Sequence, residues 1–254
     1  MNTRINAANS GVFPRLGKIL PDSFQGLEKT AGSVSKVWKT LTTVVPPPVF
    51  TVVPGLQIWC VDLAALVSEE RYLSSLLDTT EREEIQQLHH AHDRQKMILR
   101  RGVRRVVLGR YLECAPEQLR FERAEHGKPR VPGISFSASS SQLAVLLAVA
   151  RGAEVGVDVE DVSAFEFTSA LAGTCCNHAE CGRIAELPAA ERAVEFLRLW
   201  TAKEAVLKLR GVGFREQVDL PRLLENLLVG ERVVEPSLAP PLVASLAVAP
   251  LMPS

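Results

Sequence analysis

The sequence predicts an α+β fold built from two similar halves. Apolar residues recur every three or four positions over 93–110 and 189–209, which indicates two long amphipathic helices. Strand-like segments surround both helices, so the order of elements is strands, helices, strands, and then helices and strands again. A turn at Arg151-Gly152 separates the two series. We therefore expect an N-terminal half over 49–152 and a C-terminal half over 153–254.

The composition is typical of a soluble globular protein. The chain has 254 residues, 46% of them hydrophobic, which is enough for one large domain or two small ones. The 29 basic and 29 acidic residues cancel, so no overall field favours nucleic acid or a membrane as a partner. The five cysteines do not suit a disulfide framework, so we expect a cytoplasmic protein. No apolar run reaches the roughly 18 residues of a membrane span.

Residues 1–48 differ from the rest of the chain. They contain six basic residues, scattered Ser, Thr and Asn, and only two acidic residues, Asp22 and Glu28. We expect a disordered N-terminal extension. An organelle transit segment is the alternative, although a clear amphipathic helix is missing. Pro46-Pro47-Pro48 gives a stiff boundary before the folded part.

Short β-branched and aromatic runs define the expected strands. The helical pattern of the N-terminal half covers 68–114, with a helix start at Thr80, before Glu81. Gly211 follows the helix at 189–209, where a C-terminal cap is expected. The expected strands are 49–53, 57–63, 119–122, 134–137, 143–150, 154–159, 229–234 and 242–249.

Asp158 and Glu160 form the sharpest local signal, in the run Gly156-Val157-Asp158-Val159-Glu160. Side chains two apart on a strand point the same way, so the two carboxylates share one face. Hard oxygen ligands of this kind suit Mg²⁺. Taken alone, the pair is also typical of a solvated strand edge.

A second signal lies on the predicted helix at 189–209. Glu204 and Lys208 are four residues apart and therefore share one face of that helix. Alone, they are an ordinary surface ion pair. Together with Asp158 and Glu160, they offer a third carboxylate for a metal or a proton and a lysine for a phosphate.

The two motifs together resemble the 4'-phosphopantetheinyl transferase superfamily, of the type that activates surfactin synthetase. That family has a G-[IV]-D-x-E strand and, some forty residues later, a helix reading W-x-x-K-E-[AS]-x-x-K. Gly156–Glu160 and Trp200–Lys208 match both patterns without a break. The resemblance covers roughly residues 57 to 214. It implies two α/β halves in a pseudo-twofold arrangement, with the active site between them.

The resemblance also implies how coenzyme A binds. Gly127-Lys128-Pro129 is similar to the family's G-K-P turn, whose lysine binds coenzyme A, and Lys96 lies where a basic residue contacts the nucleotide. The family's F-N-x-S-H-S segment is Phe136–Ser141 here, so Ser139 keeps the first serine and Ser140 replaces the histidine. A serine carries no positive charge, so we expect weaker or altered coenzyme A binding.

What the resemblance implies for the reaction is transfer of 4'-phosphopantetheine from coenzyme A to a serine of an acyl or peptidyl carrier protein. Asp158, Glu160 and Glu204 would hold Mg²⁺. Glu204 would remove the serine proton, Lys208 would stabilise charge on the phosphate, and Lys203 would assist more peripherally. We expect a monomer, because both halves lie in one chain.

Three other interpretations remain open at this stage. The arginines of 93–110 are an electrostatic footprint that nucleic-acid-binding proteins share, although no nucleic-acid motif accompanies them. Cys175, Cys176, His178 and Cys181 have a metal-ligand composition but lack a second C-x-x-C half. A relative that binds coenzyme A without catalysis is the third possibility, because the histidine is missing.

Overall fold

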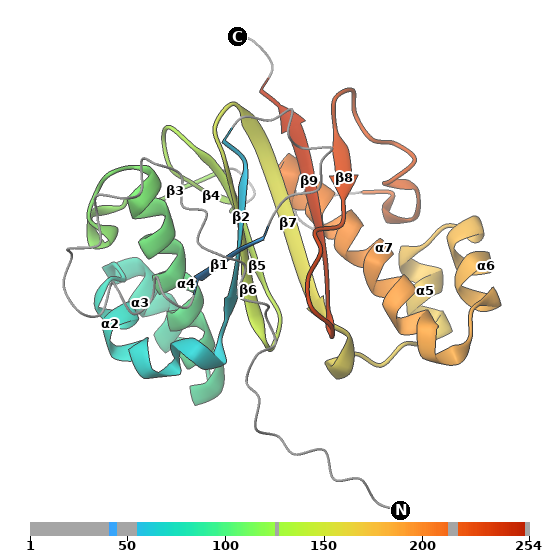
Figure 1. The fold of residues 1–254 in the computed structure, drawn as a ribbon, viewed down its shortest axis with the longest axis horizontal. Helices are drawn as coiled ribbons and strands as arrows, with labels where there is room; N and C mark the ends of the chain where they lie inside the picture. The colour runs from blue at the N-terminus through green and yellow to red at the C-terminus, as the bar shows by residue number, and fades with distance from the viewer. Residues whose placement is uncertain (1–40, 45–54, 125–126, 213–217, 252–254) are drawn as a thin grey trace, which may run out of the picture.

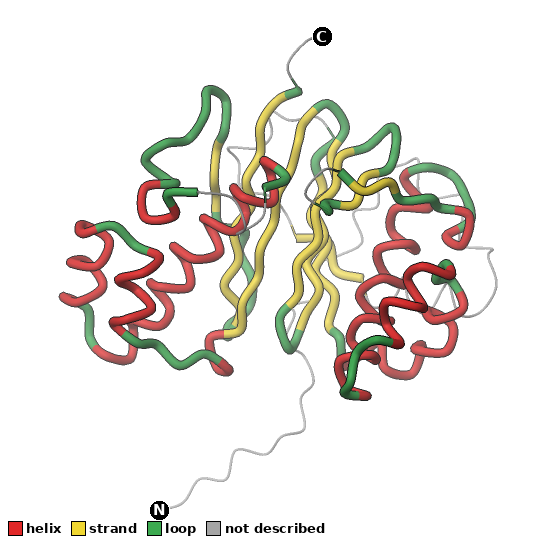
Figure 2. The backbone as a smooth tube through the Cα atoms, turned by 180° about the vertical axis from the view of Figure 1, so that it is seen from behind, coloured by secondary structure: helices red, strands yellow, loops and turns green. Residues whose placement is uncertain are grey.

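The structure is a computed structural model that describes residues 41–44, 55–124, 127–212 and 218–251. Two sheets lie side by side in the middle of the molecule, and one group of helices covers each outer side (Figures 1 and 2). This is the predicted α+β class. The twofold relation between the halves and their exact boundaries stay predictions. Within the described ranges, no helix is both long enough and apolar enough to cross a membrane.

The first sheet belongs to the N-terminal half, and its neighbouring strands are all antiparallel. Its order is β1 (Leu41–Val44), β2 (Gln57–Asp62), β6 (Ala144–Ala150) and β5 (Ser135–Ser140). Strand β2 is buried on both faces. Trp59 and Val61 contribute to the core beneath the helices, and Ile58 and Cys60 to the core between the sheets. Burial on both faces explains why β2 and β6 are mostly continuous apolar runs.

Strand β1 lies inside the range 1–48 that the sequence assigns to a disordered extension. It pairs with β2 in the register Leu41↔Val61 to Val44↔Ile58, so these four residues are part of the sheet. The strand predicted at 49–53 lies outside the described residues, as do residues 1–40.

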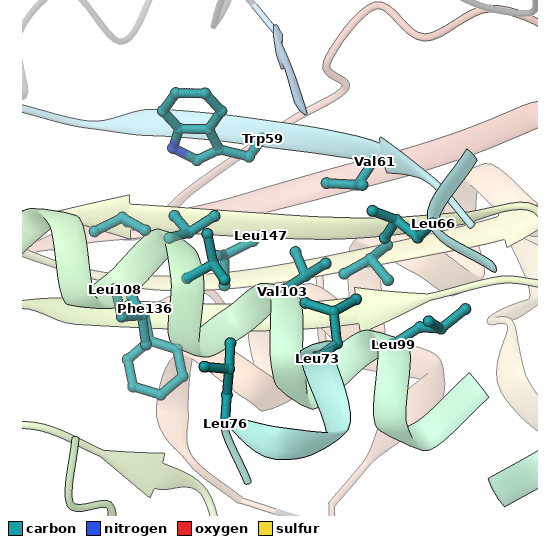
Figure 3. Close-up of a cluster of buried hydrophobic side chains, with 14 of the residues drawn as sticks. Trp59, Val61, Leu66, Leu73, Leu76, Leu99, Val103, Leu108, Phe136 and Leu147 are labelled. Carbon is teal, nitrogen blue, oxygen red and sulfur yellow. The ribbon is translucent and has the colours of Figure 1, made fainter. Parts of the chain in front are cut away.

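Three helices cover the outer face of the first sheet: α2 (Glu70–Ser75), α3 (Thr79–Gln86) and α4 (Ala91–Tyr111). Leu73, Leu99 and Val103 fill the core between them and the sheet (Figure 3). Helix α3 begins one residue before the predicted Thr80. The reason is a capping box in which Asp78 accepts from the backbone of Glu81, and the Glu81 side chain accepts from the backbone of Asp78.

Short elements lie between the sheet and the helices that cover it. They are η3 (Ala64–Glu69) before α2, and then η4 (Pro116–Gln118), β3 (Glu122–Arg123) and β4 (Pro129–Arg130). The strand predicted at 119–122 is wrong except for its last residue. Leu119 ends the η4 turn and is buried in the core, and pairing with β4 begins only at Glu122.

The second sheet has the order β7 (Ala153–Asp161), β9 (Leu242–Pro250) and β8 (Arg232–Val234), again antiparallel. The alternate residues Val155, Val157 and Val159 of β7 face the first sheet. Strand β8 is shorter than the predicted 229–234, because Gly230 has a φ of 88° and turns the chain before Arg232.

The helices of the C-terminal half are α5 (Ser169–Cys175), α6 (His178–Glu186) and α7 (Ala189–Arg210), with η5 (Val162–Ala164) and η6 (Leu220–Arg222) in the connections. Helix α7 lies against β7 and β9, and the hydroxyls of Thr201 and Ser245 hydrogen bond at 2.9 Å in that contact. As predicted, Gly211 ends the helix in the left-handed region, with a φ of 70°.

The contact between β7 and α7 is unusually close at Gly156. A Cβ atom at this position would lie 2.0 Å from the carbonyl oxygen of Ala205 and 2.3 Å from the amide nitrogen of Leu209. Only a glycine allows the strand backbone to rest directly on the helix backbone. The glycine of the G-V-D-V-E run is therefore required for packing.

Gly156→Ala should destabilise the protein by at least about 3 kcal/mol, because the clash is with backbone atoms that cannot move aside. Gly173→Ala is the matched control. Gly173 lies inside α5 with open space around its Cα, so an alanine should stabilise the protein by up to about 1 kcal/mol. Urea denaturation measures both changes. An equal, small effect for the two variants would contradict the close approach at Gly156.

Candidate active site

The site is centred on Asp158, in the middle of β7. Its carboxylate is 4% exposed and faces α7, on the opposite side of the strand from Val157 and Val159. Oδ1 accepts two hydrogen bonds of 2.6 Å, from the hydroxyl of Ser139 on β5 and from the ammonium of Lys208 on α7. Lys208 also donates to the Ser139 hydroxyl, at 3.0 Å. The site thus joins one residue from the N-terminal half to two from the C-terminal half.

Two further carboxylates accompany Asp158. The pKa of Glu204 rises from its ordinary value of 4.5 to about 7, because the side chain is desolvated and lies near Asp158 and Glu160, although Lys208 opposes the shift. The pKa of Glu160 is also raised, by burial and by Asp158, while Lys208 and a hydrogen bond from Trp200 lower it. Three acids therefore share one lysine, and the site has an excess of negative charge.

Lys203 is not at this site. Its side chain is completely buried and donates to Glu180 Oε2 at 2.6 Å and to the carbonyl oxygens of Cys175 and Pro221. An ammonium held by three partners inside the protein cannot reach a ligand. The predicted peripheral role of Lys203 in binding coenzyme A does not fit this position. The lysine instead ties α7 to α5, α6 and η6.

A cavity of about 380 Å³ begins at this cluster and extends to α4. Lys208, Gly211 and Val212 line it from the C-terminal half. The N-terminal half contributes the remaining lining residues, which combine basic, apolar and small side chains. They are Met97, Arg100, Arg101, Arg104, Gly127, Lys128, Pro129, Phe136, Ser137, Ala138, Ser139 and Val145.

The residues predicted to bind coenzyme A fall into two groups. Lys128 and Ser139 line the cavity, as does Lys208. Lys128 also donates to the carbonyl oxygen of Val155 at 3.1 Å, and its pKa is lowered by burial. Lys96 and Ser140 do not line the cavity. Lys96 donates to Gln142 in the turn between β5 and β6, and Ser140 lies half-buried at the end of β5.

Three arginines of the basic face predicted on α4 line the cavity: Arg100, Arg101 and Arg104. Arg101 pairs with Glu84 at 2.6 Å and Arg104 with Glu81 at 2.7 Å, so both are partly neutralised by α3. Arg100 has no carboxylate partner among the described residues, and its pKa is lowered by desolvation and by Arg101. It is therefore the cation of the cavity wall that is best placed to take an anion. The spacing of Met97, Arg100, Arg101 and Arg104 on one helix face is the signal that marks them.

Comparisons with known proteins point to the family that the motifs resemble. The sequence profile described as the 4'-phosphopantetheinyl transferase superfamily matches residues 154–231, which contain Asp158, Glu160, Glu204 and Lys208. Over this part of the chain, the match is to the superfamily that the two motifs resemble. The expected resemblance to this family and the assignment to the phosphopantetheinyl transferase class of enzymes are both confirmed.

Individual relatives carry the same name. The 4'-phosphopantetheinyl transferase HetI of Nostoc sp. is 28% identical over 69% of this chain and 76% of its own length. The putative 4'-phosphopantetheinyl transferase slr0495 of Synechocystis sp. is 29% identical over 63% of this chain. The 4'-phosphopantetheinyl transferase Sfp of Bacillus subtilis is 25% identical over 59% of this chain. The present chain covers 66% of the length of the Synechocystis relative and 66% of the length of Sfp.

The raised pKa of Glu204 predicts a pH dependence of stability in the absence of divalent cations. The folded state holds the Glu204 proton up to about pH 7 and the unfolded chain only to about 4.5, so this stabilisation is complete below pH 4.5 and is lost as the pH rises through 7. Glu204→Gln removes this dependence. Thermal melts between pH 4.5 and 7.5 should therefore show the wild type losing stability relative to Glu204→Gln as the pH rises. A constant difference between the two proteins would contradict the shift.

Proposed function

We propose that this transferase moves the 4'-phosphopantetheine group of coenzyme A to a serine hydroxyl of an acyl or peptidyl carrier protein, converting the apo carrier to the holo form. The observation that carries the proposal is the contact of Asp158, Ser139 and Lys208 at one end of a basic cavity. An anionic, elongated donor fits a cavity with cations along its wall. The names of the relatives support the same reaction.

The carboxylates are suited to a divalent cation. Asp158 Oδ2 and Glu204 Oε1 are buried and have no hydrogen-bond partner among the described residues, which leaves two oxygen ligands in an acidic site. No group of three or more His, Cys, Asp or Glu side chains in the described ranges is arranged as a metal site. We propose that Asp158, Glu160 and Glu204 would hold Mg²⁺ after side-chain adjustment. When bound, the ion would neutralise the pyrophosphate of the donor.

The protein's own side chains are proposed to act on different atoms during the reaction. The serine oxygen attacks the phosphorus that bears pantetheine, and the bond from that phosphorus to the bridging oxygen of the pyrophosphate breaks. The leaving group is the nucleotide, which keeps that oxygen. Glu204 is proposed to accept the serine proton. Lys208 is proposed to donate to the phosphate oxygens that gain charge.

The rest of the cavity is proposed to bind the donor. Lys128 and Arg100 lie on its wall and supply positive charge for phosphates, while Phe136 and Met97 supply apolar surface for the base. Ser140 does not line the cavity, and Arg100 offers a charge that does not depend on that position.

Glu204→Gln and Lys208→Ala should each reduce transfer at least about a hundredfold, because each removes a group that acts on the reacting atoms. Mass spectrometry of an apo carrier protein incubated with coenzyme A, Mg²⁺ and the transferase measures the gain of the phosphopantetheine mass. Glu191→Gln is the matched control, since Glu191 is exposed in the first turn of the same helix. Wild-type transfer by a folded Glu204→Gln protein would refute the assignment.

A further inference from the structure

The two oxygens of Asp158 have different surroundings. Oδ1 is saturated by the Ser139 hydroxyl and the Lys208 ammonium, each at 2.6 Å, while Oδ2 is buried without a partner among the described residues. Because the residue is 4% exposed on a strand packed against α7, its carboxylate has little room to turn toward solvent. A cation that approaches Asp158 therefore meets a carboxylate already bound to an ammonium.

Of the three side chains in this contact, that of Lys208 has the most room to move. Its side chain is 30% exposed, lines the cavity, and extends from the last turn of α7 on four methylene groups. Asp158 and Ser139 sit on strands and are buried. When a second cation arrives, Lys208 is thus the group that can move, and the cavity is the space into which it can move.

The charges around the lysine lead to the same conclusion. Among the described residues, Asp158 and Asp161 raise the pKa of Glu160, and Asp158 and Glu160 raise the pKa of Glu204. Lys208 is the charged group that lowers both pKa values, and a hydrogen bond from Trp200 lowers that of Glu160 as well. Lys208 is therefore the internal counterion of this acidic cluster. A divalent cation would neutralise the same carboxylates and would repel the ammonium of Lys208.

We infer that Lys208 and a divalent cation compete for the carboxylate of Asp158, so that the lysine lowers the metal affinity of the free protein. The inference rests on the proposed metal ligands. It adds a coupling between the binding of the donor and the binding of the cation. Donor phosphates that draw Lys208 into the cavity would release Asp158 for the cation, and by thermodynamic reciprocity the cation would favour the donor.

Mn²⁺ alone is the probe, because free Mn²⁺ is counted by electron paramagnetic resonance without any turnover. The full chain is titrated in the absence of coenzyme A, and thermal melts confirm that each variant is folded. Lys208→Met should bind Mn²⁺ on the order of tenfold more tightly than wild type, since it removes one charge-assisted hydrogen bond to the ligand. Lys208→Arg keeps that bond and should bind as wild type does.

Lys128→Met is the matched control. It removes a positive charge from the same cavity wall, but Lys128 bonds to the carbonyl of Val155 and has no contact with Asp158. Its Mn²⁺ affinity should stay close to that of wild type. Equal tightening by Lys128→Met and Lys208→Met would show a general charge effect and overturn the competition.

Asp158→Asn separates this inference from the proposed function. If Asp158→Asn abolishes Mn²⁺ binding while Lys208→Met does not tighten it, the metal ligands stand and the competition is wrong. If Asp158→Asn binds Mn²⁺ as wild type does, or if neither wild type nor Lys208→Met shows saturable binding, the metal site and the competition are both wrong.

Discussion

The direct contact of the β7 backbone with the α7 backbone at Gly156 is the constraint on which the site depends. A side chain at this position would overlap the carbonyl oxygen of Ala205, so the strand and the helix can approach this closely only at a glycine. The approach has a chemical consequence two residues later. Asp158 lies within hydrogen-bond distance of Lys208, and both residues shift the pKa of Glu204, Lys208 downward and Asp158 upward. The glycine, the carboxylates and the lysine are therefore one structural unit.

Serine side chains join this unit to the N-terminal half. The hydroxyls of Ser135 and Ser137 accept from the backbone amides of Val155 and Val157, at 3.3 and 3.1 Å, and Ser139 donates to Asp158. These three serines alternate along β5, so one face of that strand meets the edge of β7. Buried amides need partners, and the serines satisfy them where no strand pairing does. These three serine contacts fix the position of the N-terminal half's cavity wall relative to Lys208.

Local patterns predicted much of this from sequence. Alternation placed Asp158 and Val157 on opposite faces of a strand, and helical spacing placed Glu204 and Lys208 on one face of α7, because both periods are properties of the backbone. The left-handed cap at Gly211 follows from the same kind of rule. Elements whose limits depend on their neighbours were less predictable, as the shortened strand before Arg232 shows.

Contacts between residues that are far apart in the sequence could not be predicted from it. Lys203 and Lys208 are both lysines on α7, yet one is enclosed by Glu180 and two carbonyl groups and the other borders the cavity. The different environments of the two lysines depend on how α5 and α6 pack on α7, and a local sequence motif does not determine that packing. The same holds for Arg100, which differs from Arg101 and Arg104 only because α3 supplies partners to the other two.

Packing at Gly156 brings Asp158 and Lys208 into direct contact, and a double-mutant cycle on the free energy of unfolding tests that contact. Asp158→Asn, Lys208→Met and the double variant are compared with wild type by urea denaturation at neutral pH without divalent cations. We expect a coupling energy of about 1–3 kcal/mol between the two positions, because the carboxylate is buried and the contact is charged on both sides. Strictly additive effects of the two substitutions would contradict it.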